Sequence, residues 1–501
     1  MNDLSAHVQR FRAVLTRRLG LEFDDGKAAS LAELLHTRSG ARDIEAYLAR
    51  LEGREGQTEA RELARELTVG ETYFFRHADQ FRAFEEVALP ARIRARSSAR
   101  ALRILSAGCA SGEEAYSLAV GVRNALPDLD SWQAKLQGID VNPTMIAKAI
   151  RAHYSAWSLR EITPEKRERH FHLEGREFRL EEAVRRMVSF EERNLVDDDP
   201  LFWQDQIFDV IFCRNVLMYF TAEAARAVVA KFARSLAPGG FLFLGHAETL
   251  RGISQDFHLR HSHDAFYYQR RDGTDVPCIA PPIVQHAPPL DMGSMSWADV
   301  IQGASDRIAK LGRKSSPPRP VTGAQASPGA GHQSGWDLRP VEEMLRQERF
   351  VDAMDLLQAL PPASSTDADA QILRAVLFTN SGKLIEAEDV CRQILAADEL
   401  NAGAHYLLAL CREHAGDRTA ALDHDQAAIH LDAEFVMPHL HLGLLARRAG
   451  EPDRARAELG RALTLLPRED ASRILLFGGG FAREALITLC RAELQACGDR
   501  S

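Results

Sequence analysis

The sequence predicts an α/β domain built on a parallel sheet, with a helical region before it and an all-α array of repeats after it. Between residues 101 and 269, short apolar runs alternate with helical segments, as expected of strands joined by helical crossovers. The first 90 residues carry apolar side chains at three- and four-residue steps. After residue 337, glycine and alanine recur every 34 residues. These observations divide the 501 residues into domains at 1–90, 91–271 and 338–501, with a linker at 272–337.

The N-terminal region, residues 1–90, is predicted to be a small helical bundle. Its helical periodicity is present in three stretches, which begin at Phe11, Leu31 and Ile44. In each stretch an apolar residue returns after three or four positions, so one face of the helix is apolar. We expect these faces to pack together and against the next domain.

The α/β domain, residues 91–271, is predicted from six apolar runs. Four of them fit a parallel sheet, because helical segments after Glu113, Pro143 and Ala222 separate one run from the next. The other two resemble a closing hairpin, and Pro238-Gly-Gly240 predicts a turn before the fourth strand. The expected strands are Leu102–Ser106, Ala134–Ile139, Phe208–Phe212 and Phe241–Leu244, followed by the hairpin strands Phe257–Arg260 and Ala265–Gln269.

The C-terminal third is predicted to be an array of tetratricopeptide repeats. Gly382, Gly416 and Gly450 lie 34 residues apart, and three alanines repeat in the same register. A 34-residue period with small residues where two helices cross is typical of this repeat. Ile474–Cys497 is expected to form one capping helix, which such arrays need for solubility.

Composition and charge exclude several classes of function. Charged residues are 27% and hydrophobic residues 45%, as in globular chains, whereas the Pro-, Gly- and Ser-rich residues 272–337 predict a flexible linker. The net charge of −9 argues against nucleic-acid binding. We expect no membrane insertion, because the sequence has no signal peptide and no apolar stretch long enough to span a bilayer. Seven cysteines without a CxxC pair fit a reducing cytoplasm and predict no metal site.

Two stretches of the α/β domain predict a crevice for a nucleotide-bearing cofactor. In Arg103–Ser117 an apolar run breaks into small residues and then opens a helix, which lets the backbone approach a ligand at the end of a parallel strand. The second stretch, Phe208–Phe220, begins with a buried strand, Phe208–Phe212, and continues into polar Arg214 and Asn215 at the same edge. Glu113 and Glu114, which we expect to face the ligand, suit hydroxyls and a cationic centre better than a pyrophosphate. S-adenosylmethionine is such a ligand.

Four motifs follow one another in a fixed order: Glu71–Arg76 reads ETxFFR, Gly112–Ser117 reads GEExYS, Phe212–Phe220 reads FCRNVxxYF and Gly245–Glu248 reads GHxE. In this order, over about residues 10–270, the chain resembles the bacterial chemoreceptor glutamate methyltransferases of the CheR type. The resemblance implies a Rossmann-like methyltransferase domain with a small β-subdomain near residues 171–190. It also implies a helical domain before the methyltransferase domain.

By this resemblance, S-adenosylmethionine would contact eight residues. Asp140 ends the second strand, the position that takes ribose hydroxyls, although a helix N-cap before Pro143 is an alternative for it. Arg76 and Tyr219 are implied as catalytic residues that orient the acceptor, and for Tyr219 a packed aromatic is the alternative. The implied cofactor-binding set is Thr72, Arg76, Glu114, Asp140, Asn194, Leu195, Asn215 and Val216.

Two departures from the family concern the cofactor and the receptor. Gly70 stands where relatives usually carry asparagine, two residues before Thr72. The β-subdomain segment His172–Leu180 is short and lacks a glycine-rich loop, so we expect no capture of a receptor's tethering peptide. The resemblance implies the cytoplasmic domain of a chemoreceptor as the protein substrate. The repeats imply a second, unidentified partner at their groove.

Three functions are therefore open. The leading one is an S-adenosylmethionine-dependent protein-glutamate O-methyltransferase that acts on a chemoreceptor in a chemotaxis-like signalling pathway. The alternatives are a methyltransferase with a different acceptor and a scaffold that acts through its repeats. Because Arg76, Glu114, Asp140, Asn215 and Tyr219 are all present, we favour an active enzyme.

Overall fold

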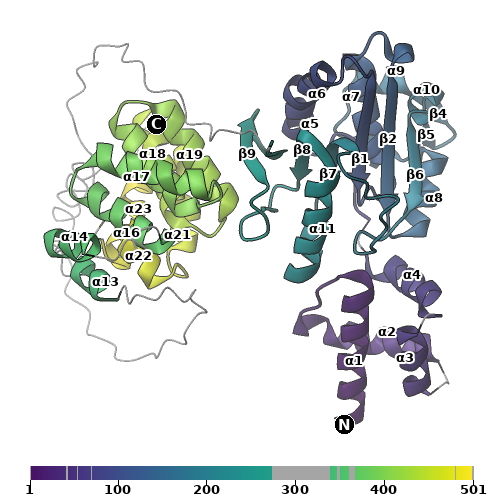
Figure 1. The fold of residues 1–501 in the computed structure, drawn as a ribbon, viewed down its shortest axis with the longest axis horizontal. Helices are drawn as coiled ribbons and strands as arrows, with labels where there is room; N and C mark the ends of the chain where they lie inside the picture. The colour runs from purple at the N-terminus through teal and green to yellow at the C-terminus, as the bar shows by residue number, and fades with distance from the viewer. Residues whose placement is uncertain are drawn as a thin grey trace. The chain divides into compact units, whose positions relative to one another are not determined.

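The computed structural model describes residues 2–272, apart from 41, 42, 54 and 69, and then residues 339–346, 350–359, 367–479 and 481–498. They divide into two compact units, Met1–Asp275 and Val276–Ser501 (Figure 1). The linker predicted at 272–337 lies, beyond Asp272, outside the described residues. Within the described residues, no helix is long and apolar enough to cross a membrane.

Four helices at the N-terminus form a bundle around its own core, as the periodicity predicts. Phe11, Leu35, Leu48 and Leu63 are fully buried there. Figure 1 shows this bundle at one end of the sheet of the α/β domain. The bundle helices are α1 (Asn2–Leu19), α2 (Ala28–Ser39), α3 (Ile44–Glu52) and α4 (Gly56–Leu67), with a short turn η1 (Asp25–Lys27) between the first two.

A seven-stranded sheet in the order β6-β2-β1-β7-β8-β10-β9 is the centre of the α/β domain. Its first five strands run parallel, and β9 and β10 close it as an antiparallel hairpin. All six predicted strands are present, and β6 is an additional edge strand. The strands are β1 (Ala101–Ala107), β2 (Gln133–Asp140), β6 (Val188–Glu192), β7 (Phe208–Cys213), β8 (Leu236–Leu244), β9 (Phe257–Ser262) and β10 (Ala265–Arg270).

The turn predicted at Pro238-Gly-Gly240 is wrong, because these residues lie inside β8. Phe208 pairs with Leu236 and Val210 pairs with Phe241, so the extra residues of β8 are absorbed by an irregularity in the ladder. Gly239 takes φ +65°, which a residue with a side chain rarely adopts. The residues thus form an irregularity within the strand rather than a turn, since the positive φ that glycine adopts is common in both β-bulges and turns.

Helices connect the parallel strands and cover the sheet. An aromatic stack of Phe212, Phe243 and Tyr267 fills the core between β7, β8 and β10, with ring centroids 4.3 and 5.0 Å apart. Nine-residue α8 begins at its cap Asn142, whose side chain accepts from the amides of Thr144 and Met145. The helices are α5 (Ala78–Ala83), the π-helix η2 (Phe84–Ala88), α6 (Leu89–Ala95), α7 (Glu113–Ala125), η3 (Leu129–Ser131), α8 (Pro143–Arg151) and α11 (Ala222–Ser235).

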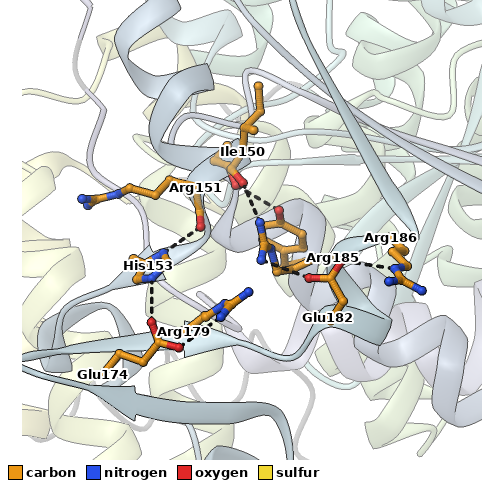
Figure 2. A network of polar contacts seen from close by, with 10 residues as sticks. Ile150, Arg151, His153, Glu174, Arg179, Glu182, Arg185 and Arg186 are labelled. Carbon is orange, nitrogen blue, oxygen red and sulfur yellow. Dashed lines mark hydrogen bonds and ion pairs between the residues drawn. The ribbon is translucent and has the colours of Figure 1, made fainter.

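A three-stranded antiparallel sheet forms the small β-subdomain that the resemblance implies. Its order is β3 (His153–Tyr154), β5 (Glu177–Leu180), β4 (Phe171–Glu174). Only two residues, 175 and 176, join β4 to β5, so the connection is a tight hairpin. Figure 2 shows the charged side chains on it, where Glu174 binds both His153 and Arg179, at 3.3 and 3.1 Å. Its flanking helices are η4 (Ala156–Leu159), α9 (Pro164–His170) and α10 (Glu182–Arg185).

The second unit is an array of helix pairs with the predicted period. Gly382, Gly416 and Gly450 each take a positive φ between the two helices of a pair, and the alanines at 387, 421 and 455 are fully buried where helices cross. The pairs are α13 (Arg339–Arg346) with α14 (Phe350–Gln358), α16 (Ala368–Asn380) with α17 (Leu384–Ala397), α18 (Ala402–His414) with α19 (Arg418–Leu431), and α20 (Val436–Arg448) with α21 (Pro452–Leu465).

The single capping helix predicted at Ile474–Cys497 is wrong. The chain instead forms two helices, α22 (Ala471–Phe477) and α23 (Arg483–Gly498). Gly478 and Gly479 follow α22 directly, and glycine is a poor helix former. Only α23 continues the stack, because it packs on α21 and α20, whereas α22 contacts α13 and α16.

Candidate active site

A pocket lies at the carboxyl ends of β1, β2, β6 and β7, where it meets the N-terminal helices. It encloses about 1330 Å³ of space, open solvent at its mouth included. Every residue of the implied catalytic and cofactor-binding sets lines this pocket. They are Thr72, Arg76, Glu114, Asp140, Asn194, Leu195, Asn215, Val216 and Tyr219. Such a crevice, at the carboxyl edge of a parallel sheet, is where doubly wound folds bind their ligands.

The loop after β1 forms one wall of the pocket, and four of its backbone amides already donate hydrogen bonds within the protein. The backbone N–H groups of Gly108 and Cys109 donate to the Ile139 carbonyl at 2.8 and 3.0 Å. The Ala110 amide donates to Asp140 Oδ2 at 2.9 Å, and the Gly112 amide donates to the Cys109 carbonyl. A phosphate-binding loop must present free amides to its ligand. This loop therefore suits a cofactor without a pyrophosphate, such as S-adenosylmethionine.

Asp140 ends β2 with its carboxylate at the pocket. Its oxygens accept from the amides of Ala110 and Asn142, and it forms no ion pair with any described residue. Burial raises the pKa of Asp140 above its usual range, although these backbone hydrogen bonds oppose the shift. The N-cap alternative is wrong, because Asn142 caps α8. The carboxylate can still accept hydrogen bonds from hydroxyl groups.

Glu114 is the second residue of α7 and lines the same pocket. Its carboxylate accepts from Ser106 Oγ at 2.7 Å and pairs with Arg214 Nη1 at 3.3 Å. Burial raises the pKa of Glu114, and the charge of Arg214 limits that rise. The expectation that Glu113 also faces the ligand is wrong. Glu113 is 2% exposed and accepts from two serine hydroxyls away from the pocket, Ser111 and Ser158.

Asn194 and Leu195 follow β6 and connect the sheet to the N-terminal bundle. Asn194 Nδ2 donates to the Arg18 carbonyl at 2.9 Å, and its Oδ1 accepts from the Val196 amide at 3.2 Å. The Leu195 side chain is buried at the pocket, and Lys231 Nζ donates to its carbonyl. The amide group of Asn194 therefore fixes the pocket wall.

A buried carboxylate, Glu248, holds the loop that carries Asn215 and Val216. It accepts from the amides of Gly245, Asn215, Val216 and Met218 at 2.6 to 3.1 Å. Asn215 takes φ +59°, so the loop needs this anchor to keep a sparsely populated backbone conformation. The GHxE motif contains Glu248, but the sequence did not reveal that its partners lie about 30 residues earlier in the chain.

Arg76 and Tyr219 stand at the mouth of the pocket. Arg76 donates to the Glu71 carbonyl at 3.1 Å, and its own carbonyl accepts from Arg214 Nη2 at 2.6 Å. Tyr219, in the short helix η5 (Leu217–Tyr219), is 39% exposed, so it is not a core aromatic. Its backbone carbonyl accepts from the Glu22 amide, which attaches this side of the pocket to the N-terminal bundle.

Arg214 and Met145 line the pocket as well, and sequence reasoning gave neither a role. Arg214 is buried and links Glu114 to the backbone of Arg76, so it fixes both sides of the pocket. Met145 occupies the space beside Gly70, where an added Cβ would lie 2.7 Å from Met145 Cε. An asparagine at position 70 would therefore require Met145 to move.

Known proteins are similar in sequence to this chain. Residues 70–266 match the family described as CheR methyltransferase, SAM binding domain. WspC of Pseudomonas putida, named a probable biofilm formation methyltransferase, is 28% identical over 91% of this chain and 97% of its own. Chemotaxis protein methyltransferase 2 of Vibrio cholerae is 30% identical over 53% of this chain and 93% of its own. Chemotaxis protein methyltransferase 1 of Pseudomonas aeruginosa is 30% identical over 52% and 96%. The chain therefore belongs to the CheR methyltransferase family, and its α/β domain is an S-adenosylmethionine-binding domain.

Proposed function

We propose that this enzyme methylates glutamate side chains in the cytoplasmic domain of a chemoreceptor. One observation carries the proposal: residues of three separate motifs line a single pocket at the sheet edge, and Glu248 of the fourth motif holds one of its loops. The relatives named chemotaxis protein methyltransferases support an acceptor of the chemoreceptor class. WspC, which is named for biofilm formation, matches over 91% of this chain. We therefore propose a chemotaxis-like pathway whose output is not swimming alone.

The reaction requires orientation rather than proton transfer. A glutamate side chain has a reference pKa near ~4.3, so at neutral pH it is already a nucleophile and needs no general base. S-adenosylmethionine supplies an activated methyl group on a cationic sulfur. The enzyme must hold the acceptor carboxylate in line with that methyl, with reacting atoms about 3 Å apart. Several positive charges around the carboxylate would weaken its nucleophilicity.

Arg76 and Tyr219 are the residues that we assign to acceptor orientation. Only one guanidinium nitrogen of Arg76 donates to the protein in a described hydrogen bond, so the other donors are available to a carboxylate. The exposed Tyr219 hydroxyl can donate from the other side of the mouth without adding charge. We assign cofactor contacts to Thr72, Arg76, Glu114, Asp140, Asn194, Leu195, Asn215 and Val216.

The buried acids of the pocket support a cationic ligand. Asp140 has no ion-pair partner among the described residues, and Glu114 pairs with Arg214. Both carboxyl pKa values are raised by burial, which means that the protein alone stabilises their charges poorly. Hydroxyls and a positive centre in the pocket would stabilise both carboxylates. S-adenosylmethionine offers these groups.

The test is transfer of a tritium-labelled methyl group from S-adenosylmethionine to a purified receptor cytoplasmic domain. We expect receptor-bound label that alkali releases as methanol, because glutamate methyl esters hydrolyse in base. Arg76→Ala should abolish most of it, whereas Arg82→Ala, an exposed arginine of α5, serves as the matched control. Alkali-stable label would contradict glutamate as the acceptor, and label on a small molecule alone would contradict a protein acceptor.

We also propose that the repeats bind a partner and that the enzyme works in the cytoplasm, where receptor output domains lie. The stacked helix pairs provide an extended surface of the kind that repeat proteins use for binding. All described cysteines are buried free thiols, as a reducing compartment allows. A chain lacking the repeats should lose methylation rate mainly at low receptor concentration, because the linked repeats raise the local concentration of whatever they hold. Equal rates at every concentration would contradict recruitment.

A further inference from the structure

The short helix α22 lies along the repeats instead of extending them. It contacts α13 and α16, and its C-terminal end contacts α18 and the residue before α20 (Figure 1). The helices α13, α16 and α18, and α20 that follows this residue, are the first helices of successive pairs. We call the surface that they form the first-helix face. A segment that spans several repeats on one face occupies the place where a repeat protein would bind an extended ligand.

Phe477 anchors α22 to this face. Its ring lies 5.1 Å from the Phe435 ring and 6.0 Å from the Tyr406 ring, both in edge-to-face geometry. The Tyr406 hydroxyl donates to the Phe477 carbonyl at 3.4 Å. Beneath the ring lies Gly403, where an added Cβ would come within 2.8 Å of Phe477 Cζ. Phe477 is 8% exposed, so the face provides a fitted aromatic pocket.

Arg473, one helical turn before Phe477, is the second anchor. Its guanidinium lies 4.4 Å from the Phe435 ring centroid and pairs with Asp432 at 3.1 Å. Ile474, beside it, is buried. The anchoring part of α22 thus carries three features: a cation, a buried aliphatic side chain and, three residues after that, a phenylalanine.

The helical form of α22 depends on this face. Seven residues are too few for a stable isolated helix, because nucleation costs more than so few hydrogen bonds return. The segment is also bounded by Pro467 on one side and by Gly478 and Gly479 on the other, which separate it from the continuous helices. A segment with these boundaries can leave the face while α21 and α23 stay paired.

We propose that α22 is an internal ligand of the repeats. The first-helix face binds a partner peptide of the same chemistry, a short helix with arginine, an aliphatic residue next to it and phenylalanine four residues after the arginine. Partner and α22 exclude each other, so the partner must displace α22. The internal segment acts at an effective concentration near ~1 mM, and it therefore sets the affinity that a true partner must exceed. This inference does not depend on which acceptor the enzyme methylates.

The test uses the full chain and a fluorescent peptide with the sequence of residues 467–479. Fluorescence anisotropy should show weak binding to the wild type, because α22 already occupies the face. Phe477→Ala should empty the aromatic pocket and tighten peptide binding at least tenfold. Arg473→Ala should give a smaller gain, and it keeps the test valid if the first variant folds poorly by circular dichroism. Equal affinity for the wild type and both folded variants would overturn the proposal.

Two controls separate an emptied face from a generally loosened array. Gly403→Leu, added to Phe477→Ala, should remove peptide binding, because its side chain fills the space of the ring. A peptide with alanine in place of the phenylalanine should not bind. Ile385→Ala, at a side chain 78% exposed in α17, should leave the weak wild-type affinity unchanged. Binding that survives Gly403→Leu would place the peptide elsewhere and contradict the assignment.

Discussion

Buried Asp425 in the repeats and partly buried Asp140 in the pocket are stabilised in different ways. In the repeats, His441 is fully buried between Asp425 at 2.6 Å and Glu413 at 2.7 Å, and Glu413 also pairs with Arg448. Two positive and two negative charges face one another there. In the pocket, Asp140 accepts only backbone amides from the described residues.

The difference distinguishes an architectural charge from a functional one. A buried charge whose partners come from its own helices holds those helices together. A buried charge without such partners is poorly stabilised until a ligand arrives, and perturbed carboxylates in a cleft are typical of functional sites. Sequence alone does not separate the two cases, because Asp425 and Asp140 are the same residue type on regular elements.

The largest expected effect comes from breaking the closed cluster. His441→Leu leaves the carboxylates of Asp425 and Glu413 buried without their central cation, which should cost about 3–5 kcal/mol of unfolding free energy. Chemical denaturation would measure the loss. His414→Leu, an exposed histidine of α18, should change stability by less than about 0.5 kcal/mol. Similar losses for both variants would show that the cluster contributes little.

Acceptor orientation should give the next largest effect. Tyr219→Phe and Arg76→Ala should lower the turnover of receptor methylation about 10- to 100-fold, because a misplaced nucleophile loses its in-line approach. Cofactor affinity should fall much less in Tyr219→Phe, since the hydroxyl serves the acceptor. Met218→Ala, an exposed neighbour in the same loop, is the control. Full turnover by Tyr219→Phe would remove the tyrosine from the reaction.

The histidines of the array should make its stability fall at both ends of the pH scale. Burial lowers the pKa of His441, but Asp425 and Glu413 more than reverse this and raise it to about 10. Stability from His441 is therefore complete below its ordinary value of 6.5 and is lost as pH rises toward 10.

His424 has the opposite sign, because burial and the neighbouring His405 lower its pKa to about 3. Its contribution is present above pH 6.5 and is lost as pH falls toward 3. Thermal unfolding across this range would measure both limbs. His441→Leu should flatten only the alkaline limb, and an unchanged alkaline limb would contradict the assigned sign.

The smallest effect concerns Gly70 and Met145. Gly70→Ala should weaken cofactor binding by about 1 kcal/mol, the low end of overpacking costs, because its Cβ meets the Met145 thioether at the pocket wall. Met145→Ala should relieve that clash, so the two changes together should be less harmful than Gly70→Ala alone. Additive losses in a double-mutant cycle would show that the two positions are independent.

Local pattern was sufficient to predict most of the fold. The strand–helix alternation and the 34-residue period follow from side-chain spacing, whereas the residues around the pocket were implied by the resemblance of four motifs to a known family. Helix geometry could also have excluded Glu113, since adjacent residues on a helix point about 100° apart and only one can face the ligand. Gly478 and Gly479 could likewise have predicted the break between α22 and α23.

Long-range partners could not be predicted in this way. Glu248 anchors a loop about 30 residues earlier, Arg214 reaches the Arg76 carbonyl, and Phe477 inserts beside Tyr406 in another repeat. Each depends on how distant elements meet, and no local period records such a meeting. The close approach of Met145 to Gly70 is a further case, because two residues far apart in sequence together shape one wall.

The central claim is that Asp140, a pocket carboxylate without an ion pair among the described residues, awaits a ligand, whereas the paired acids of the repeats do not. Calorimetric titration with S-adenosylhomocysteine, whose thioether stands in for the demethylated sulfonium, tests it directly. Asp140→Ala should weaken binding about tenfold or more, as expected for the loss of about 1.5–3 kcal/mol of hydrogen bonds to a charged group. His441→Leu should leave the affinity unchanged. Wild-type affinity in a folded Asp140→Ala variant, or an equal loss in both variants, would contradict the account.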